Sequence, residues 1–156
     1  MKISLIYPYF LETRIHAEEI AAVPMGLYYI GAMLKSRGHD VQILNWHAAG
    51  DSPEMINETL ISLKPDVIGF SILHANRWGG IDIARIAKAL DPKVTVVFGG
   101  IGATFLWDHL LKHFQEIDYI VLGEGEYTFP KLAEALESGA SPDQAESNRC
   151  STRSPS

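Results

Sequence analysis

Two glycine-rich runs carry the residues whose types and spacing could bind a ligand. Each begins as a short apolar stretch that breaks into glycines, at Val96–Thr104 and at Tyr119–Glu126. Glycine lets a flat or bulky group approach the backbone, while threonine and glutamate supply hydrogen-bonding oxygens. These runs favour a cofactor-binding domain. The candidate contacts within them are Gly99, Gly100, Gly102, Thr104, Gly123, Glu124 and Gly125.

A third candidate segment, Ser71–Arg77, follows another apolar stretch. Ser71 offers a hydroxyl group, and Ile72 and His74 follow it at the start of a predicted loop. A histidine in such a loop is more often solvated than bound to a metal. We predict that Ser71, Ile72 and His74 contact the ligand, because they follow the end of a strand. Because loop histidines are usually solvated, none of the three is expected to bind a metal.

The chain alternates predicted strands with predicted helices, which determines where these segments lie. Strands are expected at Ile3–Tyr7, Asp40–Leu44, Val67–Ser71, Val94–Phe98 and Tyr119–Leu122. Helices are expected from Pro24 to Gly38, Ser52 to Leu63, Gly80 to Leu90, across Leu106–Phe114, and from Tyr127 to Glu137. This alternation predicts a five-stranded parallel sheet, doubly wound and flavodoxin-like, with strand order 2-1-3-4-5. Carboxyl ends of parallel strands share one edge, so the three candidate segments are expected to meet there.

Composition indicates one domain followed by a polar end. The chain has 156 residues, of which 47% are hydrophobic and 21% charged, as in a globular protein with a core. Residues 1–138 are expected to form the α/β domain. Residues 139–156 have little to bury and are expected to be a disordered tail or a linker stub.

Charge and cysteine content exclude several classes of partner. The net charge of −6 gives no electrostatic support for binding nucleic acid or an anionic membrane. No apolar run approaches the roughly 20 residues of a membrane span, and the amino-terminal sequence has no signal-peptide pattern. Cys150 is the single cysteine, so the chain holds no internal disulfide, and a cytoplasmic setting is expected.

Common chemistries of α/β folds lack their sequence patterns here. The first strand ends in Tyr7-Pro8-Tyr9, without the glycines of a dinucleotide site, and no Walker phosphate loop occurs. Tyr7 and Ser71 stand where a phosphoacceptor receiver domain carries acidic residues. The Gly-x-Ser-x-Gly elbow of hydrolases is also absent. No catalytic residue is therefore predicted.

Five short pieces, taken in order, resemble the cobalamin-binding domain found at the amino terminus of many radical S-adenosylmethionine enzymes. They are Pro24–Leu27, Gly38–Val41, Pro65–Ser71, Phe98–Thr104 and Asp118–Glu126. The resemblance covers about residues 1–138. It implies a cobalamin over the carboxyl ends of the strands, with the nucleotide tail in a groove lined by Ser71, Gly99, Gly100 and Thr104. The substitution Gly100→Val is then expected to block binding and to leave the fold intact.

The resemblance also implies base-off cobalamin without a histidine ligand from the protein. Asn45–Gly50 imitates the Asp-x-His-x-x-Gly pattern of domains such as that of methionine synthase. It follows the second strand, however, and begins with asparagine, so the carboxylate that would orient the imidazole of His47 is missing. Neither His47 nor His74 is expected to coordinate cobalt.

A catalytic partner is expected because the chain lacks the Cys-x-x-x-Cys-x-x-Cys motif of radical S-adenosylmethionine enzymes. The iron–sulfur cluster, S-adenosylmethionine and the methyl transfer or radical chemistry are expected in a missing domain or a separate subunit. This chain alone is not expected to be catalytic. Two alternatives remain. One is a flavodoxin-like module that binds a nucleotide or a partner without cobalamin, and the other is half of a sugar-nucleotide transferase.

Overall fold

The computed structural model describes residues 1–10, 23–47, 52–140 and 150–152. Its strands are β1 (Lys2–Tyr7), β2 (Asp40–Asn45), β3 (Val67–Ser71), β4 (Thr95–Gly99), β5 (Tyr119–Val121) and β6 (Cys150–Thr152). Its helices are α1 (Met25–Ser36), α2 (Pro53–Leu63), α3 (Arg77–Leu90), α4 (Ile101–His113) and α5 (Gly125–Ser138). Strands and helices alternate from β1 to α5 as predicted. Within the described ranges, no helix combines the length and apolar character needed to cross a membrane.

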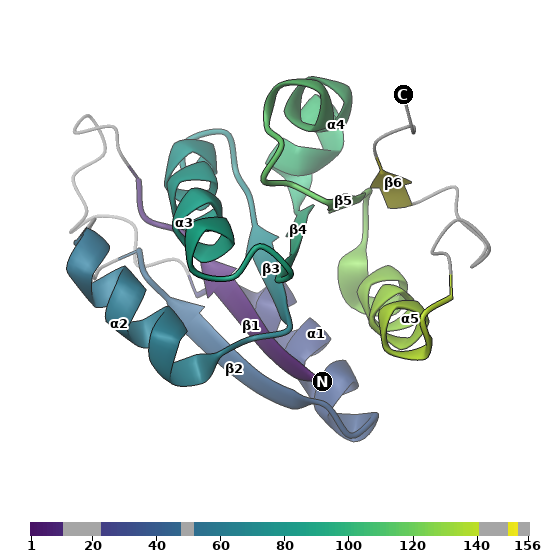
Figure 1. Cartoon of the computed structure of the whole chain (residues 1–156). Helices are drawn as coiled ribbons and strands as arrows, with labels where there is room; N and C mark the ends of the chain where they lie inside the picture. Colours follow the sequence, from purple (N-terminus) through teal and green to yellow (C-terminus); the bar gives the residue numbers. More distant parts are fainter. Residues whose placement is uncertain (11–22, 48–51, 141–149, 153–156) are drawn as a thin grey trace.

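The strands form one sheet in the order β2-β1-β3-β4-β5-β6. Strands β1 to β5 run parallel, which confirms the predicted order 2-1-3-4-5. Helices α1 and α5 cover one face of the sheet, and α2, α3 and α4 cover the other (Figure 1). The fold is therefore a doubly wound, flavodoxin-like α/β domain. The carboxyl ends of β3, β4 and β5 lie at one edge, next to the starts of α3, α4 and α5.

Each face of the sheet has its own hydrophobic core. Leu34 and Phe129 belong to the core beneath α1 and α5, whereas Ile56 and Leu110 belong to the core beneath α2, α3 and α4. The central strand β3 is buried on both faces over Val67–Phe70. A continuous apolar run is typical of such a strand, because helices cover both sides of a parallel sheet. This packing holds the strand ends in place.

The short strand β6 was not predicted. It pairs antiparallel with β5, with Ser151 opposite Ile120. It lies within the segment expected to be a disordered tail, of which 141–149 and 153–156 lie outside the described residues. A polar strand of three residues has no hydrophobic pattern of its own. The segment is a strand because it pairs with the edge strand β5. The periodicity of its own sequence cannot predict such pairing.

Candidate functional site

A pocket of about 250 Å³ opens at the carboxyl ends of β3, β4 and β5, beside α1 and α5. We call it the carboxyl-end pocket. The strands bring its walls together, because β3 and β4 pair with Ser71 beside Gly99, and β5 follows β4 in the sheet. All three predicted segments contribute to it. Six of the predicted contacts line it, namely Ser71, Gly99, Gly100, Gly123, Glu124 and Gly125.

Glycines form a cradle in the wall of the carboxyl-end pocket. A Cβ atom built at Gly99 would meet no heavy atom nearer than 3.8 Å, and one built at Gly26 or Gly123 would meet none within 4 Å. A methyl group would therefore find open space at Gly26 and Gly123 and ordinary van der Waals contact at Gly99, although the φ of 69° at Gly123 also favours glycine there. Buried apolar side chains such as Leu5 and Phe129 line the same pocket. A flat apolar group, such as an aromatic base, fits between these surfaces.

Gly69 and Phe129 line the pocket, although neither was among the predicted contacts. A Cβ atom at Gly69 would lie 2.7 Å from the ring of Phe129 and 2.9 Å from Cδ2 of Leu5. Phe129 of α5 therefore packs directly on the backbone of β3. A glycine inside an otherwise apolar strand is the sequence signal for such a close approach. The signal was present, but it does not say which side chain approaches.

Gly100 and Gly102 hold the start of α4 against the loop after β3. Gly100 has a φ of 89°, and its Cβ atom would lie 2.9 Å from the carbonyl oxygen of Ile72. A Cβ atom at Gly102 would lie 2.7 Å from the carbonyl carbon of Leu73, and Gly102 N donates to Ile72 O at 2.9 Å. A side chain at either glycine would therefore strain the packing of α4 on this loop. The φ and the close contact at Gly100 argue against the expectation that Gly100→Val leaves the fold intact, and Gly102 does not line the pocket.

Thr104 lies behind the pocket and does not line it. Its hydroxyl group donates to Gly100 O at 2.9 Å and accepts from Gly123 N at 2.9 Å. The Thr104 hydroxyl, which is expected to bind the nucleotide tail, is therefore already hydrogen-bonded within the protein. Thr104 therefore positions two pocket glycines, one at the end of β4 and one after β5.

Asn76 holds the loop after β3, although it was not among the predicted contacts. Its side chain is fully buried, with Oδ1 accepting from Leu73 N at 2.7 Å and Nδ2 donating to Ser71 O at 3.3 Å. Ile72 is also fully buried, and His74 is exposed. Neither of these two residues lines the carboxyl-end pocket. Among the predicted contacts of this segment, Ser71 is the one that reaches it.

His47 lies in an aromatic cluster at the ends of β1 and β2. Its ring centroid is 4.7 Å from that of Phe10 and 6.2 Å from that of Tyr7. Both ring nitrogens are buried and have no hydrogen-bond partner among the described residues. The backbone N–H of His47 donates to Oδ1 of Asn45 at 3.2 Å. Burial raises the pKa of Tyr7 in this cluster. His47 is not part of the carboxyl-end pocket.

The carboxyl-end pocket is acidic at its rim. Glu124 and Glu126 line it at the start of α5, where the helix dipole stabilises negative charge. None of its described lining residues is a lysine or an arginine. Carboxylates accept hydrogen bonds from amide and hydroxyl groups, and they repel a phosphate that has no cation beside it. The pocket suits a bulky ligand with many such donors better than a free nucleotide.

Comparison with known proteins places the chain in a family. Residues 19–133 match the family described as B12 binding domain. The chain is 31% identical over 139 residues to an uncharacterized methyltransferase of Pyrococcus horikoshii. This alignment covers 89% of this chain and 30% of the methyltransferase. It is 32% identical over 117 residues to the anaerobic magnesium-protoporphyrin IX monomethyl ester cyclase of Rubrivivax gelatinosus. That alignment covers 74% of this chain and 21% of the cyclase. The chain spans less than a third of the length of these relatives.

The fold also matches a solved structure. The cobalamin-dependent S-adenosylmethionine radical enzyme OxsB, solved with aqua-cobalamin and S-adenosylmethionine bound, has a TM-score of 0.74 to this chain at 17% identity. The match covers 99% of this chain and 22% of OxsB, and it shows that the two share a fold. The family match rests on sequence and extends over most of the chain. The resemblance found from the sequence is therefore confirmed, and the chain belongs to the B12-binding domain family.

Proposed function

We propose that this chain binds cobalamin base-off, with the nucleotide tail in the carboxyl-end pocket and no histidine of the protein on cobalt. The observation that carries the proposal is the glycine cradle of Gly26, Gly99 and Gly123, which leaves room for a flat group beside an apolar floor. The pocket has space for the tail and not for a whole corrin ring. The ring would lie over the strand ends, outside the pocket.

The lining residues would hold the tail by complementary chemistry. Phe129 and Val121 offer apolar surface to the base, and Gly99 admits its flat face. Ser71 offers a hydroxyl group, and the carboxylate of Glu124 would accept from ribose hydroxyl or corrin amide groups. The phosphate, which Glu124 and Glu126 would repel, would lie on the opposite side of the pocket beside Gly100, where the dipole at the start of α4 favours negative charge. Bound cobalamin would supply a cobalt centre for methyl transfer or radical chemistry in the complete enzyme.

The absence of a histidine ligand is inferred from the sequence, because no Asp-x-His-x-x-Gly pattern follows β1 and Asn45 stands where the orienting carboxylate for His47 would be. His47 packs against Phe10 and Tyr7 and is not part of the pocket. His74 is exposed and also lies outside the lining. Insertion of the tail into a pocket removes its base from the cobalt, so a base-off form is expected. The variant His47→Ala should therefore leave the spectrum of bound cobalamin unchanged.

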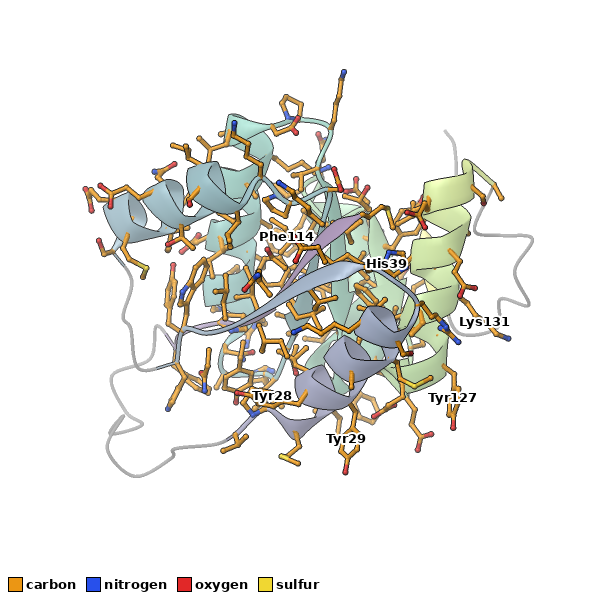
Figure 2. All side chains as sticks on the ribbon, turned by 90° about the horizontal axis from the view of Figure 1, so that it is seen from below. Tyr28, Tyr29, His39, Phe114, Tyr127 and Lys131 are labelled. Carbon is orange, nitrogen blue, oxygen red and sulfur yellow. The ribbon has the colours of Figure 1, made fainter. Side chains whose placement is uncertain are left out.

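A radical S-adenosylmethionine domain or subunit is the partner that we propose. Apolar side chains are exposed near the carboxyl-end pocket, with Ile101 at 61%, Phe105 at 80% and Tyr127 at 68%. Tyr29 of α1 and Tyr127 of α5 project from the same side of the molecule (Figure 2). Exposed apolar patches of this kind mark interaction surfaces. The partner would hold the iron–sulfur cluster and S-adenosylmethionine. A domain boundary after residue 138 and a cytoplasmic location stay predictions.

Titration of the purified chain with hydroxocobalamin, followed by gel filtration and visible spectroscopy, tests the proposal. We expect corrin to stay with the protein and to show a base-off spectrum. Gly99→Val should abolish retention by filling the cradle, whereas Thr95→Val, at the other end of the same strand, should retain cobalamin. Loss of all corrin from the unaltered chain, or equal retention by Gly99→Val, would contradict the proposal. Retention of a nucleotide in its place would favour the module without cobalamin.

A further inference from the structure

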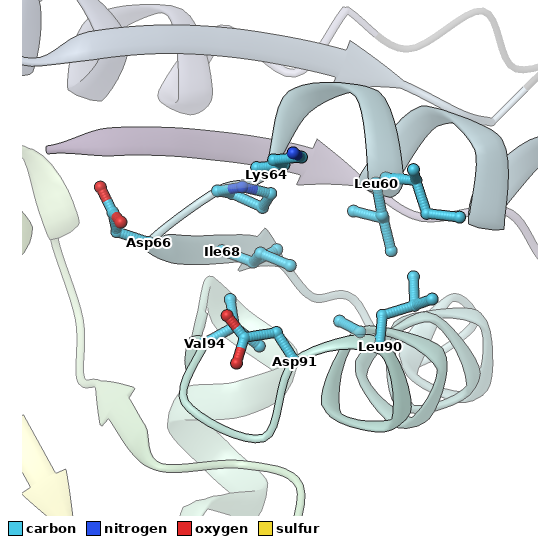
Figure 3. A pocket seen from close by; sticks show the side chains of 10 residues that line it. Leu60, Lys64, Asp66, Ile68, Leu90, Asp91 and Val94 are labelled. Atoms are coloured by element: carbon cyan, nitrogen blue, oxygen red, sulfur yellow. The ribbon is translucent and has the colours of Figure 1, made fainter.

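A second and larger pocket lies at the opposite end of the sheet. Its volume is about 460 Å³, and it opens between the carboxyl-terminal parts of α2 and α3, beside the residues that precede β3 and β4 (Figure 3). We call it the α2–α3 pocket. Ile68 of β3 lines this pocket from the face beneath α2 and α3, whereas the next residue, Gly69, lines the carboxyl-end pocket from the face beneath α5, so the sheet itself separates the two pockets. A molecule bound in one pocket leaves the other open.

Apolar side chains form the floor and walls of the α2–α3 pocket. Ile68 is fully buried at its base, and Leu60 of α2 and Leu90 of α3 face one another across it (Figure 3). Ile61 is 55% exposed and Leu90 is 42% exposed. Exposed aliphatic side chains at the mouth of a cavity leave water when another apolar group enters, which favours binding. The pocket therefore suits an aliphatic side chain.

The rim of the α2–α3 pocket favours a positively charged neighbour. Asp66 and Asp91 line the pocket together with Lys64, so carboxylates outnumber the cation. One oxygen of Asp66 accepts from Lys2 N at 2.7 Å, and one oxygen of Asp91 accepts from Lys93 N at 2.9 Å. No hydrogen bond among the described residues uses the second oxygen of either carboxylate, which can accept one from a ligand. A lysine or arginine beside the aliphatic group would meet both aspartates.

The ends of α2 and α3 add to this negative potential. The last turn of a helix has unpaired carbonyl groups that act as a partial negative charge. The last turn of α2 contains no basic residue. In α3, the basic residue Lys88 is bonded to Val94 O and to the carboxylate of Asp118, both at 2.7 Å. The charge of Lys88 is therefore already paired, and the helix ends favour a cation from outside.

We propose that the α2–α3 pocket docks a peptide segment of a protein partner, which presents an aliphatic side chain flanked by lysine or arginine. The proposal concerns the end of the domain that lies away from the carboxyl-end pocket, and it does not depend on cobalamin binding. Such a partner would hold the domain at one end and leave the other end accessible. The domain could then present its cofactor while it remains attached.

A peptide titration of the isotope-labelled full chain, followed by NMR, tests this docking site. The probe is an acetylated and amidated peptide of sequence Lys-Leu-Leu-Lys-Leu-Leu-Lys, and its control has glutamate at each lysine. We expect saturable amide shifts at Ile61, Leu90 and their neighbours, with a dissociation constant of roughly 0.1–1 mM for the cationic peptide. No saturable shift up to roughly 5 mM, or equal shifts with the acidic peptide, would overturn the proposal.

Variants of exposed residues separate docking from folding and from cofactor binding. Ile61→Lys should weaken binding of the cationic peptide about tenfold, because it adds charge and removes apolar surface. Ile101→Lys changes an exposed isoleucine at the other end of the domain and should leave peptide binding unchanged. The double variant Asp66→Asn and Asp91→Asn keeps both acceptors for the backbone and should weaken binding about two- to fivefold. Unchanged peptide affinity in Ile61→Lys and in the Asp66→Asn and Asp91→Asn double variant would count against this pocket, whatever the result with cobalamin.

Discussion

The hydroxyl group of Thr104 accepts a hydrogen bond from the backbone N–H of Gly123 at 2.9 Å, which joins the first turn of α4 to the segment after β5. The same hydroxyl donates to Gly100 O at 2.9 Å. Gly100 and Gly123 both line the carboxyl-end pocket, but Thr104 does not. The width of the pocket therefore depends on a side chain that a bound ligand would not touch.

Loss of this hydroxyl should destabilise the protein. Thr104→Val removes both bonds and leaves the N–H of Gly123 without its partner, so we expect the free energy of unfolding to fall by about 1–2 kcal/mol. Chemical denaturation measures the change. Thr59→Val is the matched control, because Thr59 donates within α2 to Met55 O at 2.8 Å and joins no separate segments. Equal losses in the two variants would contradict a linking role for Thr104, and Thr104→Ser should restore stability.

Substitution by alanine should change the stability of the protein differently at the adjacent residues Gly99 and Gly100. Gly100 has φ 89° and ψ 176°, a conformation that residues with a Cβ atom rarely adopt. Gly100→Ala should therefore lower the free energy of unfolding by about 1–3 kcal/mol. Gly99→Ala places its Cβ atom 3.8 Å from the nearest atoms and should change stability by less than about 0.5 kcal/mol. Thermal and chemical denaturation of the two variants would show the contrast, and similar stabilities would disprove it.

The buried phenol of Tyr7 should make the protein sensitive to alkaline pH. Burial raises the pKa of Tyr7 above its usual value, because the folded protein favours the neutral phenol. This contribution to stability is fully present below the pKa in the unfolded chain, about 10, and is lost as pH rises through the higher pKa of the folded state. Urea midpoints measured from about pH 8 to 11 should therefore fall at the alkaline end.

Two phenylalanine variants assign that pH dependence to one residue. Tyr7→Phe should flatten the alkaline decline, because no phenol remains to ionise there. Tyr29→Phe should keep it, because Tyr29 is 61% exposed. An unchanged decline in Tyr7→Phe would mean that another group causes the loss of stability.

The sequence was sufficient to predict the order of the parallel strands and the meeting of three segments at one edge. Continuous apolar runs and alternating helices restrict a parallel sheet to few arrangements, and strand ends follow from those arrangements. The roles of individual small residues were not predictable in the same way. Gly99 and Gly100 are neighbours of one type, yet a Cβ atom at Gly99 would make only van der Waals contacts at 3.8–3.9 Å, whereas Gly100 closes a turn on Ile72. Backbone angles and tertiary neighbours decide between these roles, and residue type reports neither.

Replacement of Lys64 by glycine should stabilise the protein, because Lys64 has a strained backbone conformation at the rim of the α2–α3 pocket. It ends α2 in the left-handed conformation, with φ 46° and ψ 60°, and it is the one non-glycine residue with positive φ in the described ranges. Glycine adopts this conformation without steric conflict. Lys64→Gly should therefore raise the free energy of unfolding by about 0.5–1 kcal/mol, as measured by chemical denaturation.

The same substitution should also strengthen docking of the cationic peptide. Removal of the lysine charge leaves Asp66 and Asp91 without a competing cation at the rim, so affinity should rise about twofold. Lys93→Gly is the control, because Lys93 is exposed in the neighbouring turn and does not have a positive φ. It should gain no stability. A less stable Lys64→Gly variant would show that contacts of the lysine side chain outweigh its backbone strain, and weaker docking would show that Lys64 itself binds the partner.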